Sequence, residues 1–234
     1  MDDRRIDRVV VVIPACDEEA LVESALRAVE ESAGALDTDV DVEVVVVANG
    51  CTDGTADRVL ECGAHLVVSD IPNVGAARAL GCRWALDRTT ADGLWIATTD
   101  ADSGVPAGWI PAQLRAAASG ADLFVGTIGL SDDDALRHPR WVTEYAGRPA
   151  DGVHRHVHGA SLGFRATTYV QVGGFRELPA HEDADLVDRM VSSGAVPWWD
   201  DRVPVITSAR HASRVAHGVG ADLRASVDVD VGAA

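Results

Sequence analysis

Two aspartates separated by a single residue follow directly after a short apolar run at residues 94–98. The run predicts a buried strand, and in an open α/β sheet ligands bind where the parallel strands end. Two carboxylates held this close together repel each other unless a cation lies between them. Hard divalent cations such as Mg²⁺ or Mn²⁺ take oxygen ligands and commonly bind through one or two carboxylates plus substrate phosphates. Asp100 and Asp102 are therefore candidates for a cation site that accompanies a diphosphate.

The position of these two aspartates, rather than their spacing, carries this inference. The same spacing recurs at five other places in the chain. Only the pair at 100 and 102 follows a predicted buried strand, so this pair is the candidate site.

Three more polar or glycine-containing segments stand at the ends of predicted strands or before a predicted helix. They are Pro14-Ala15-Cys16-Asp17-Glu18-Glu19, Asn49-Gly50-Cys51-Thr52-Asp53-Gly54-Thr55 and Asn73-Val74-Gly75-Ala76-Ala77-Arg78. Taken one at a time, they are better explained as acidic residues at a helix N-terminus, Asn-Gly and Asp-Gly turns and a loop glycine. Because arginine matches phosphate geometry in a bidentate way, Arg78 is also a candidate for diphosphate binding.

The apolar pattern predicts an α/β fold whose first half alternates strands and helices around a mostly parallel sheet. Strands are expected at residues 9–13, 42–47, 65–68, 94–98 and 123–127, and helices at residues 17–32, 55–61, 74–86 and 111–118. The second half is expected to hold a polar loop or mobile helix over the site at 131–153, a glycine-rich segment at 158–163, a short helix near residue 167, a helix at 183–192 and a strand at 203–207.

The chain, residues 1–234, is predicted to form one domain, because 47% hydrophobic residues supply a core and no repeat or linker divides the sequence. Within this domain we expect a nucleotide-binding half at 1–130, an acceptor and catalytic half at 131–220 and a tail at 221–234.

The net charge of −17 argues against partners that carry many phosphates. Such an acidic surface repels nucleic acid and anionic lipid, so no nucleic-acid partner is expected. Residues 202–220 break this trend, because they contain no Asp or Glu. This segment is either a local anion site or a solvated basic loop. Its basic residues and histidines are Arg202, Arg210, His211, Arg214 and His217.

The four cysteines form neither a CxxC pair nor a zinc-finger spacing, so ordinary reduced thiols are expected. The N-terminus lacks the apolar core of a secretory signal, and no apolar run approaches the roughly 20 residues that span a bilayer. We therefore expect a cytoplasmic protein without a membrane span, and the sequence leaves its oligomeric state open.

Taken together and in order, the motifs resemble those of a family 2 glycosyltransferase with the GT-A fold. The matching runs are Val12-Ile13-Pro14-Ala15-Cys16-Asp17-Glu18-Glu19, Asn49-Gly50-Cys51-Thr52-Asp53-Gly54-Thr55, Asn73-Val74-Gly75-Ala76-Ala77-Arg78, Thr99-Asp100-Ala101-Asp102 and His181-Glu182-Asp183-Ala184-Asp185-Leu186. His158-Gly159-Ala160 and Val172-Gly173-Gly174-Phe175 also stand where that family places its acceptor-side segment. The resemblance spans roughly residues 8 to 220, and five motifs in one order are far more specific than any single one.

The resemblance implies a GT-A-like, Rossmann-type sandwich with a mostly parallel central sheet flanked by helices. It implies an inverting enzyme that moves one sugar from a nucleoside-diphosphate-sugar donor to a small-molecule or glycan acceptor with the help of Mg²⁺ or Mn²⁺. The implied donor-binding residues are Pro14, Ala15, Cys16, Glu18, Asn49, Gly50, Asp53, Arg78, Asp100, Ala101, Arg210 and Arg214. The other implied roles are Asp183 or, as second choice, Glu182 as catalytic base, Asp102 with His211 or His217 at the metal, and His158, Gly159 and Ala160 at the acceptor.

Two departures from the family pattern narrow this expectation. The family often carries an acidic residue where Ala48 stands, so the donor base is left open between uracil, guanine and others. The Gln-x-x-Arg-Trp signature of processive polysaccharide synthases does not occur in the sequence, which favours one sugar per event over a polymer.

Three other functions compete with sugar transfer. A nucleotidyltransferase normally needs a glycine-rich, basic loop after the first strand, whereas residues 14–19 are acidic and contain no glycine. A dinucleotide oxidoreductase would carry GxGxxG at that place. The intact Glu182-Asp183 pair argues against a sugar-nucleotide-binding protein without catalysis. An activity assay decides between such a binding protein and a transferase.

Overall fold

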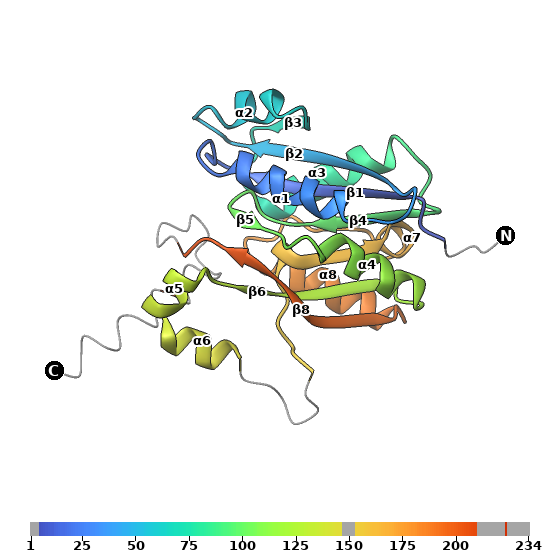
Figure 1. The fold of residues 1–234 in the computed structure, drawn as a ribbon. Helices are drawn as coiled ribbons and strands as arrows, with labels where there is room; N and C mark the ends of the chain where they lie inside the picture. Colours follow the sequence, from blue (N-terminus) through green and yellow to red (C-terminus); the bar gives the residue numbers. More distant parts are fainter. Residues whose placement is uncertain (1–4, 147–152, 210–222, 224–234) are drawn as a thin grey trace.

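A computed structural model describes residues 5–146, 153–209 and 223 of the chain (Figure 1). Its centre is an eight-stranded sheet with the strand order β3-β2-β1-β4-β7-β6-β8-β5. The strands are β1 (Arg8–Ala15), β2 (Asp41–Asn49), β3 (His65–Ser69), β4 (Leu94–Thr98), β5 (Ser103–Gly104), β6 (Leu123–Gly129), β7 (Leu162–Arg165) and β8 (Pro197–Thr207).

The sheet is mostly parallel, as predicted, but its second half is mixed. Strands β3, β2, β1 and β4 run parallel to one another, and β6 runs parallel to β8. Strand β7 lies antiparallel between β4 and β6, and the short β5 pairs antiparallel with β8. The prediction of an α/β fold with a mostly parallel central sheet is therefore confirmed.

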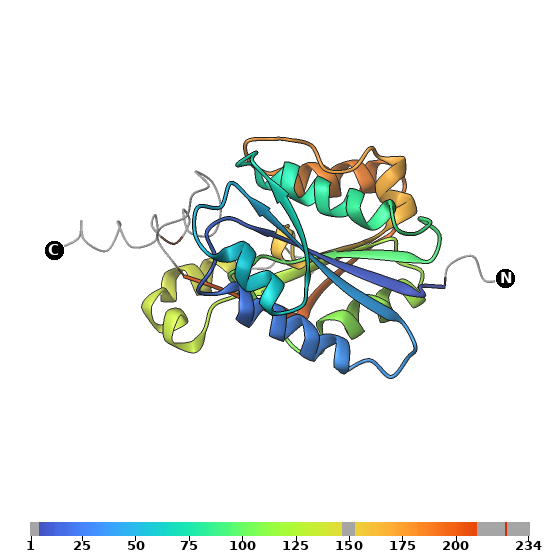
Figure 2. The same cartoon turned by 90° about the horizontal axis from the view of Figure 1, so that it is seen from above.

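Helices cover both faces of this sheet (Figure 2). Helices α1, α2 and α4 lie against one face, and α3, α7 and α8 lie against the other. The helices are α1 (Val22–Gly34), α2 (Thr55–Glu61), α3 (Val74–Leu86), α4 (Trp109–Ala118), α5 (Asp132–Arg137), α6 (Pro139–Tyr145), α7 (Ala166–Gln171) and α8 (Glu182–Ser192), with a 3-10 turn η1 (Gly159–Ser161). None of the helices in these ranges is long and apolar enough to cross a membrane.

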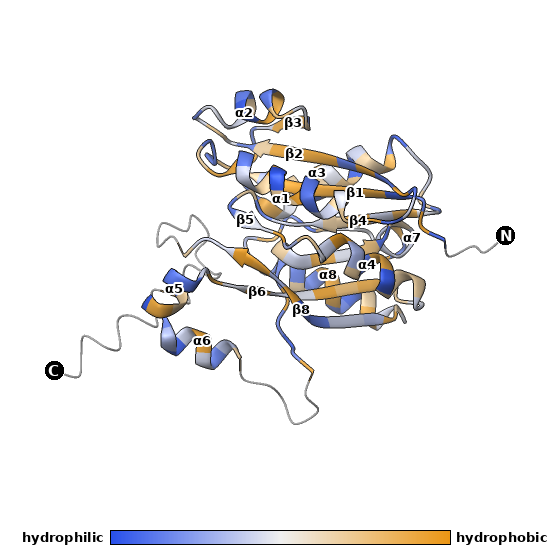
Figure 3. Ribbon diagram, in the orientation of Figure 1, coloured by the Kyte–Doolittle hydropathy of each residue, from blue (hydrophilic) through white to orange (hydrophobic). Residues whose placement is uncertain are grey.

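Strand β1 shows why the sheet needs cover on both sides. Val9, Val11 and Ile13 point into the core beneath α1 and α4, whereas Val10 and Val12 point into the core beneath α3 and α8. An unbroken apolar run of this kind is typical of a parallel strand buried on both faces. The hydropathy colouring accordingly shows long hydrophobic stretches in the central strands, whereas the helices carry both hydrophobic and hydrophilic residues (Figure 3).

Beyond shifts of one or two residues at the ends of other elements, three predicted elements differ from the structure. Helix α1 begins at Val22 rather than residue 17, because Asp17 has a positive φ of 50° and the chain turns before the helix starts. Strand β7 replaces part of the expected glycine-rich segment at 158–163. Strand β8 begins at Pro197, so the predicted strand at 203–207 is only its second half.

The segment predicted as a polar loop or mobile helix over the site contains helices α5 and α6. Figure 1 places them at the left, the side on which β1 and β2 end. Helix α6 is anchored to the rest of the protein, because Trp141 is buried and stacks on Tyr145 at a ring distance of 4.6 Å. The Tyr145 hydroxyl also accepts a hydrogen bond from the Ile128 N–H of β6 (3.0 Å).

Candidate functional site

The loops that follow β1 and β2 are tied together by side-chain to backbone hydrogen bonds. Asp17 Oδ1 accepts from the Thr52 N–H (2.5 Å), and Glu18 N–H donates to Thr55 Oγ1 (2.7 Å). Asp53 Oδ2 accepts from the Glu19 N–H (3.1 Å) in the same layer. The structure therefore gives Asp53 a role in holding these two loops at the carboxyl end of the sheet.

The pKa of Asp53 reflects this bonding. Burial alone would raise the pKa of its carboxyl, but hydrogen bonds from the Thr55 hydroxyl and from the N–H groups of Thr55 and Glu19 outweigh burial and lower it. Asp17, Cys51 and Asp53 bring possible metal-ligand atoms within 4.8 Å of one another. Because the two carboxylates already accept backbone N–H groups and the Cys51 thiol donates to Ala15 O (3.3 Å), loop bonding explains this cluster.

The remaining predicted nucleoside-side residues lie at the ends of the same two strands. Pro14 and Ala15 are buried and pair in register with Val47 and Ala48 of β2. Cys16 is half-buried just beyond β1, and Asn49 is buried at the last position of β2. Gly50 adopts a positive φ of 66°, a conformation that favours glycine and turns the chain out of the strand.

The Asn73 to Arg78 motif attaches helix α3 to the segment that precedes α8. Asn73 Oδ1 accepts from the Ala76 N–H (2.8 Å) as an N-cap, and Asn73 Nδ2 donates to Leu178 O (2.8 Å). A Cβ at Gly75 would overlap the carbonyl oxygen of Arg176, so only glycine allows this close approach. These contacts explain the asparagine and glycine of the motif by packing and capping.

Arg78 lies at the centre of the site. Its side chain is buried, with 4% of the residue exposed. Arg78 Nη2 donates to Asp100 Oδ1 (2.6 Å), and Nη1 donates to Glu182 Oε1. Burial would lower the pKa of this guanidinium, but Asp100, Glu182 and Asp183 outweigh burial and raise it. Burial has the opposite effect on the Asp100 carboxyl and raises its pKa. Asp102 and Glu182 add to this rise, and Arg78 opposes it.

The structure separates the two candidates for the catalytic base. Glu182 is buried, with 4% exposure, and its carboxylate is paired with Arg78. Asp183 is half-buried, and its Oδ2 accepts from the Gly159 N–H (2.7 Å) while its Oδ1 accepts from the Ala184 N–H (2.8 Å). Asp183 is thus the more exposed of the two carboxylates and, within the described part of the chain, the one without an ion pair.

The predicted acceptor segment lies directly beside Asp183. Thr98 Oγ1, at the end of β4, donates to Gly159 O (2.6 Å) and fixes this backbone. Burial lowers the pKa of His158 to about 4, so its ring is neutral near pH 7. His158 Nε2 has no hydrogen-bond partner among the described residues. Ala160 is buried at 5% exposure.

The charges around Arg78 suit a divalent cation. Among the described residues, the carboxylates of Asp100, Glu182 and Asp183 act on this one guanidinium, and Asp102 lies close enough to Asp100 to raise its pKa. Asp102 is half-buried and accepts from Ser103 Oγ (3.3 Å), and the neighbouring Ala101 is buried. Carboxylate oxygens are the donor set that Mg²⁺ and Mn²⁺ prefer.

Four predicted residues lie outside the described part of the chain, so the structure does not place them. They are Arg210, Arg214, His211 and His217. The sequence analysis assigned no role to two residues whose side chains hold loops of the candidate site in place. They are Asp17, which binds Thr52, and Thr98, which binds Gly159. Their contribution depends on a positive φ and on a side chain aimed at a distant backbone, and neither is visible in a residue pattern.

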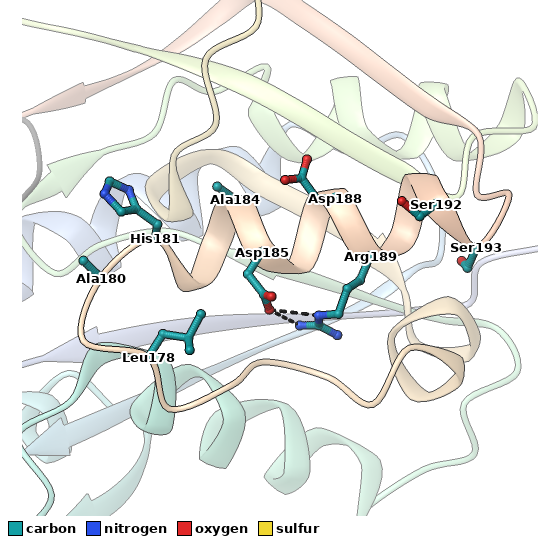
Figure 4. A pocket seen from close by; sticks show the side chains of 9 residues that line it. All are labelled: Leu178, Ala180, His181, Ala184, Asp185, Asp188, Arg189, Ser192 and Ser193. Atoms are coloured by element: carbon teal, nitrogen blue, oxygen red, sulfur yellow. Dashed lines mark hydrogen bonds and ion pairs between the residues drawn. The ribbon is translucent and has the colours of Figure 1, made fainter.

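A pocket of about 660 Å³ runs along α8 (Figure 4). Figure 4 shows His181 at the start of this helix and an ion pair between Asp185 and Arg189 on its side. Asp183 does not line this pocket, so the pocket flanks the helix that carries the candidate base. Its lining residues are Leu178, Ala180, His181, Ala184, Asp185, Asp188, Arg189, Ser192 and Ser193.

Solved glycosyltransferase structures share this fold. A mannosyltransferase from Pyrobaculum calidifontis, in complex with GDP-Man and Mn²⁺, matches with a TM-score of 0.64 and 21% identity over 91% of this chain and 60% of that chain. Staphylococcus aureus TarS in complex with UDP-GlcNAc gives 0.65 and 14%, covering 97% and 67%. Mycobacterium tuberculosis glucosyl-3-phosphoglycerate synthase with Mg²⁺ and UDP gives 0.60 and 17%, covering 96% and 79%.

Sequence comparison reaches the same class of protein. Uncharacterized glycosyltransferases of Mycobacterium tuberculosis and Mycobacterium bovis are 34% identical over 120 residues, which is 51% of this chain and 48% of theirs. The chain thus aligns with about half the length of these curated relatives. The model of glycosyl transferase family 2 matches residues 10–166, a stretch that contains most of β1, Arg78, Asp100, Asp102 and the His158 to Ala160 segment. The chain belongs to glycosyl transferase family 2.

Proposed function

We propose that this chain transfers a single sugar, with inversion, from a nucleoside-diphosphate-sugar donor to a hydroxyl group of a small-molecule or glycan acceptor, with Mg²⁺ or Mn²⁺ as cofactor. The observation that carries the proposal is the meeting of two acidic groups at Arg78. Asp100 follows the carboxyl end of β4, where the donor is expected to bind. Glu182 is the first residue of α8, and Asp183 is the second.

Family membership and the bound ligands of similar proteins support the donor class. The mannosyltransferase was solved with GDP-Man and Mn²⁺, and the glucosyl-3-phosphoglycerate synthase was solved with Mg²⁺ and UDP. The proposal leaves both the base and the sugar of the donor open, because those proteins are at most 21% identical to this chain and a shared fold does not fix a substrate.

Asp100 and Asp102 would hold the cation, together with the donor diphosphate. When bound there, the cation would stabilise the negative charge that develops on the leaving diphosphate. Asp100 follows β4 and is oriented by Arg78, while Asp102 lies two residues further along the same turn. His211 or His217 would complete this set in the proposal, as the family resemblance implies.

Asp183 would act as the general base. Inversion requires the acceptor hydroxyl to attack from the face opposite the leaving diphosphate, and a carboxylate on that face can take the hydroxyl proton. The Gly159 and Ala184 N–H groups each occupy one oxygen of Asp183, and each oxygen keeps a further lone pair for the acceptor. His158 and Ala160 would contact the acceptor beside this base.

A donor screen tests the proposal. UDP- and GDP-linked sugars are incubated with the protein, Mn²⁺ or Mg²⁺ and a panel of sugar and small-molecule acceptors, and the release of free nucleoside diphosphate is followed. We expect release that depends on both acceptor and cation, with an inverted anomeric configuration in the product. Donor binding without release under any acceptor would instead identify a sugar-nucleotide-binding protein without catalysis.

A further inference from the structure

Arg78 connects two segments that the proposed reaction uses for different tasks. It projects from α3, and its two terminal nitrogens donate to carboxylates that lie far apart in the sequence. Nη2 reaches Asp100 on the donor side (2.6 Å), and Nη1 reaches Glu182 at the first position of α8. One side chain, that of Arg78, thus attaches helix α8, which carries the candidate base, to the segment after β4 that contains Asp100.

This connection is tightly enclosed. Arg78 is 4% exposed, and a Cβ at Gly159 would lie 2.5 Å from Nη1 and overlap the rest of the guanidinium. The same Gly159 donates its N–H to Asp183 Oδ2. A displacement of Arg78 therefore reaches Asp183 by two routes, through Glu182 and through Gly159.

We infer that Arg78 is a positioning residue that couples occupation of the donor site to the placement of the catalytic base, an inference that rests on the proposed function. If Asp100 turns towards a bound cation and diphosphate, Arg78 loses part of its pairing there and pairs more strongly with Glu182. The N-terminus of α8, with Asp183, is then held more firmly at the acceptor segment. Coupling of this kind is reciprocal, so changes at Glu182 must also alter donor-site affinity.

The reciprocal effect can be measured without turnover. The affinity of the protein for UDP and for GDP, each with saturating Mn²⁺, is determined by titration calorimetry for the wild type and for Glu182→Gln. Glutamine keeps the shape and one hydrogen-bond acceptor but removes the charge. Arg78 then pairs more exclusively with Asp100 and competes with the cation, so we expect Glu182→Gln to weaken binding by about 3- to 10-fold, within the range found for contacting residues.

A double-mutant cycle separates coupling through Arg78 from a simple through-space charge effect. Glu182→Gln is repeated in an Arg78→Lys background, which keeps the positive charge but lacks the planar two-armed fork. Arg78→Gln serves as a second background, should the lysine form both contacts. Arg165→Lys is the matched control, because Arg165 is also buried, and two of its partners, Asp122 (3.5 Å) and the carbonyl of Ala117, lie outside the candidate site.

We expect the effect of Glu182→Gln to fall below about 2-fold in at least one Arg78 background and to persist in full in Arg165→Lys. The same fold-change in all backgrounds would overturn the inference and leave a plain charge effect. Wild-type protein that binds neither UDP nor GDP in the presence of Mn²⁺ would instead contradict the proposed function itself. Thermal melts of every variant confirm that folded protein is compared.

Discussion

Replacing Gly159 with alanine tests whether the acceptor segment is held where the structure places it. The added Cβ would lie 2.5 Å from Arg78 Nη1 and would overlap the guanidinium carbon. Arg78 cannot move aside easily, because both of its terminal nitrogens are bound to carboxylates and the residue is buried. The backbone at 159 must therefore shift, although Thr98 also holds its carbonyl oxygen.

Two consequences follow from this overlap. Overpacking at a buried site typically costs about 1–3 kcal/mol. In a chain of this size each kcal/mol lowers the melting temperature by roughly 2–4 °C, so we expect a drop of about 2–12 °C. The shift also disturbs the N–H of Gly159 that binds Asp183 Oδ2, and if Asp183 is the proposed base, its misplacement lowers the rate by roughly 100-fold.

The assay compares Gly159→Ala with Gly34→Ala, because a Cβ at Gly34 meets no atom within 4 Å. Melting temperature and transfer rate are measured for both proteins with the donor found in the screen. A Gly159→Ala protein that melts and turns over like Gly34→Ala would refute the close contact between Gly159 and Arg78.

Three further predictions concern the metal, His158 and the loop contacts. Exhaustive chelation should abolish transfer and added Mn²⁺ or Mg²⁺ should restore it, since three carboxylates act on the single Arg78 guanidinium in the described part of the chain; full turnover after chelation would argue against a cofactor role. Because burial lowers the pKa of His158 to about 4, its contribution to stability is present above the unfolded value of 6.5 and is lost as the pH falls towards 4. His158→Gln should therefore flatten the fall in unfolding free energy between these pH values, by an amount on the order of 3 kcal/mol, and an unchanged pH profile in denaturant melts would contradict this. Thr55→Val should lower stability by about 1–2 kcal/mol, because it removes the hydroxyl that accepts from Glu18 N–H and donates to Asp53, and a melt identical to the wild type would show that the loop bonds contribute little.

Sequence reasoning was accurate where local pattern and tertiary structure agree. Helices α2 and α3 and strand β4 have the predicted bounds, because a clear apolar pattern in each is framed by turn or capping residues such as Asn73. The motif positions were also informative, since Asp100, Arg78 and the Glu182-Asp183 pair meet in space although the sequence separates them.

The rest depended on contacts that no local pattern contains. Strand β7 was missed because Gly163 gives it a glycine-rich appearance, and the structure shows that a Cβ there would overlap Gln113. The start of α1 was misplaced because the backbone of Asp17 turns through a positive φ. Arg78 was expected at the diphosphate, but its burial and its two carboxylate partners are visible only in the folded chain.

The role of Asp183 as catalytic base is the central claim, and one comparison tests it most directly. Asp183→Asn is compared with Asp188→Asn, a change at an exposed position of the same helix. Transfer rate and affinity for the donor with Mn²⁺ are measured for both variants. We predict that Asp183→Asn keeps donor affinity within about 2-fold but loses roughly 100-fold or more in transfer, the typical contribution of a general base, while Asp188→Asn behaves like the wild type. An Asp183→Asn protein that keeps most of its transfer activity and merely melts at a lower temperature would contradict the account and make Asp183 a helix-start residue that holds Gly159.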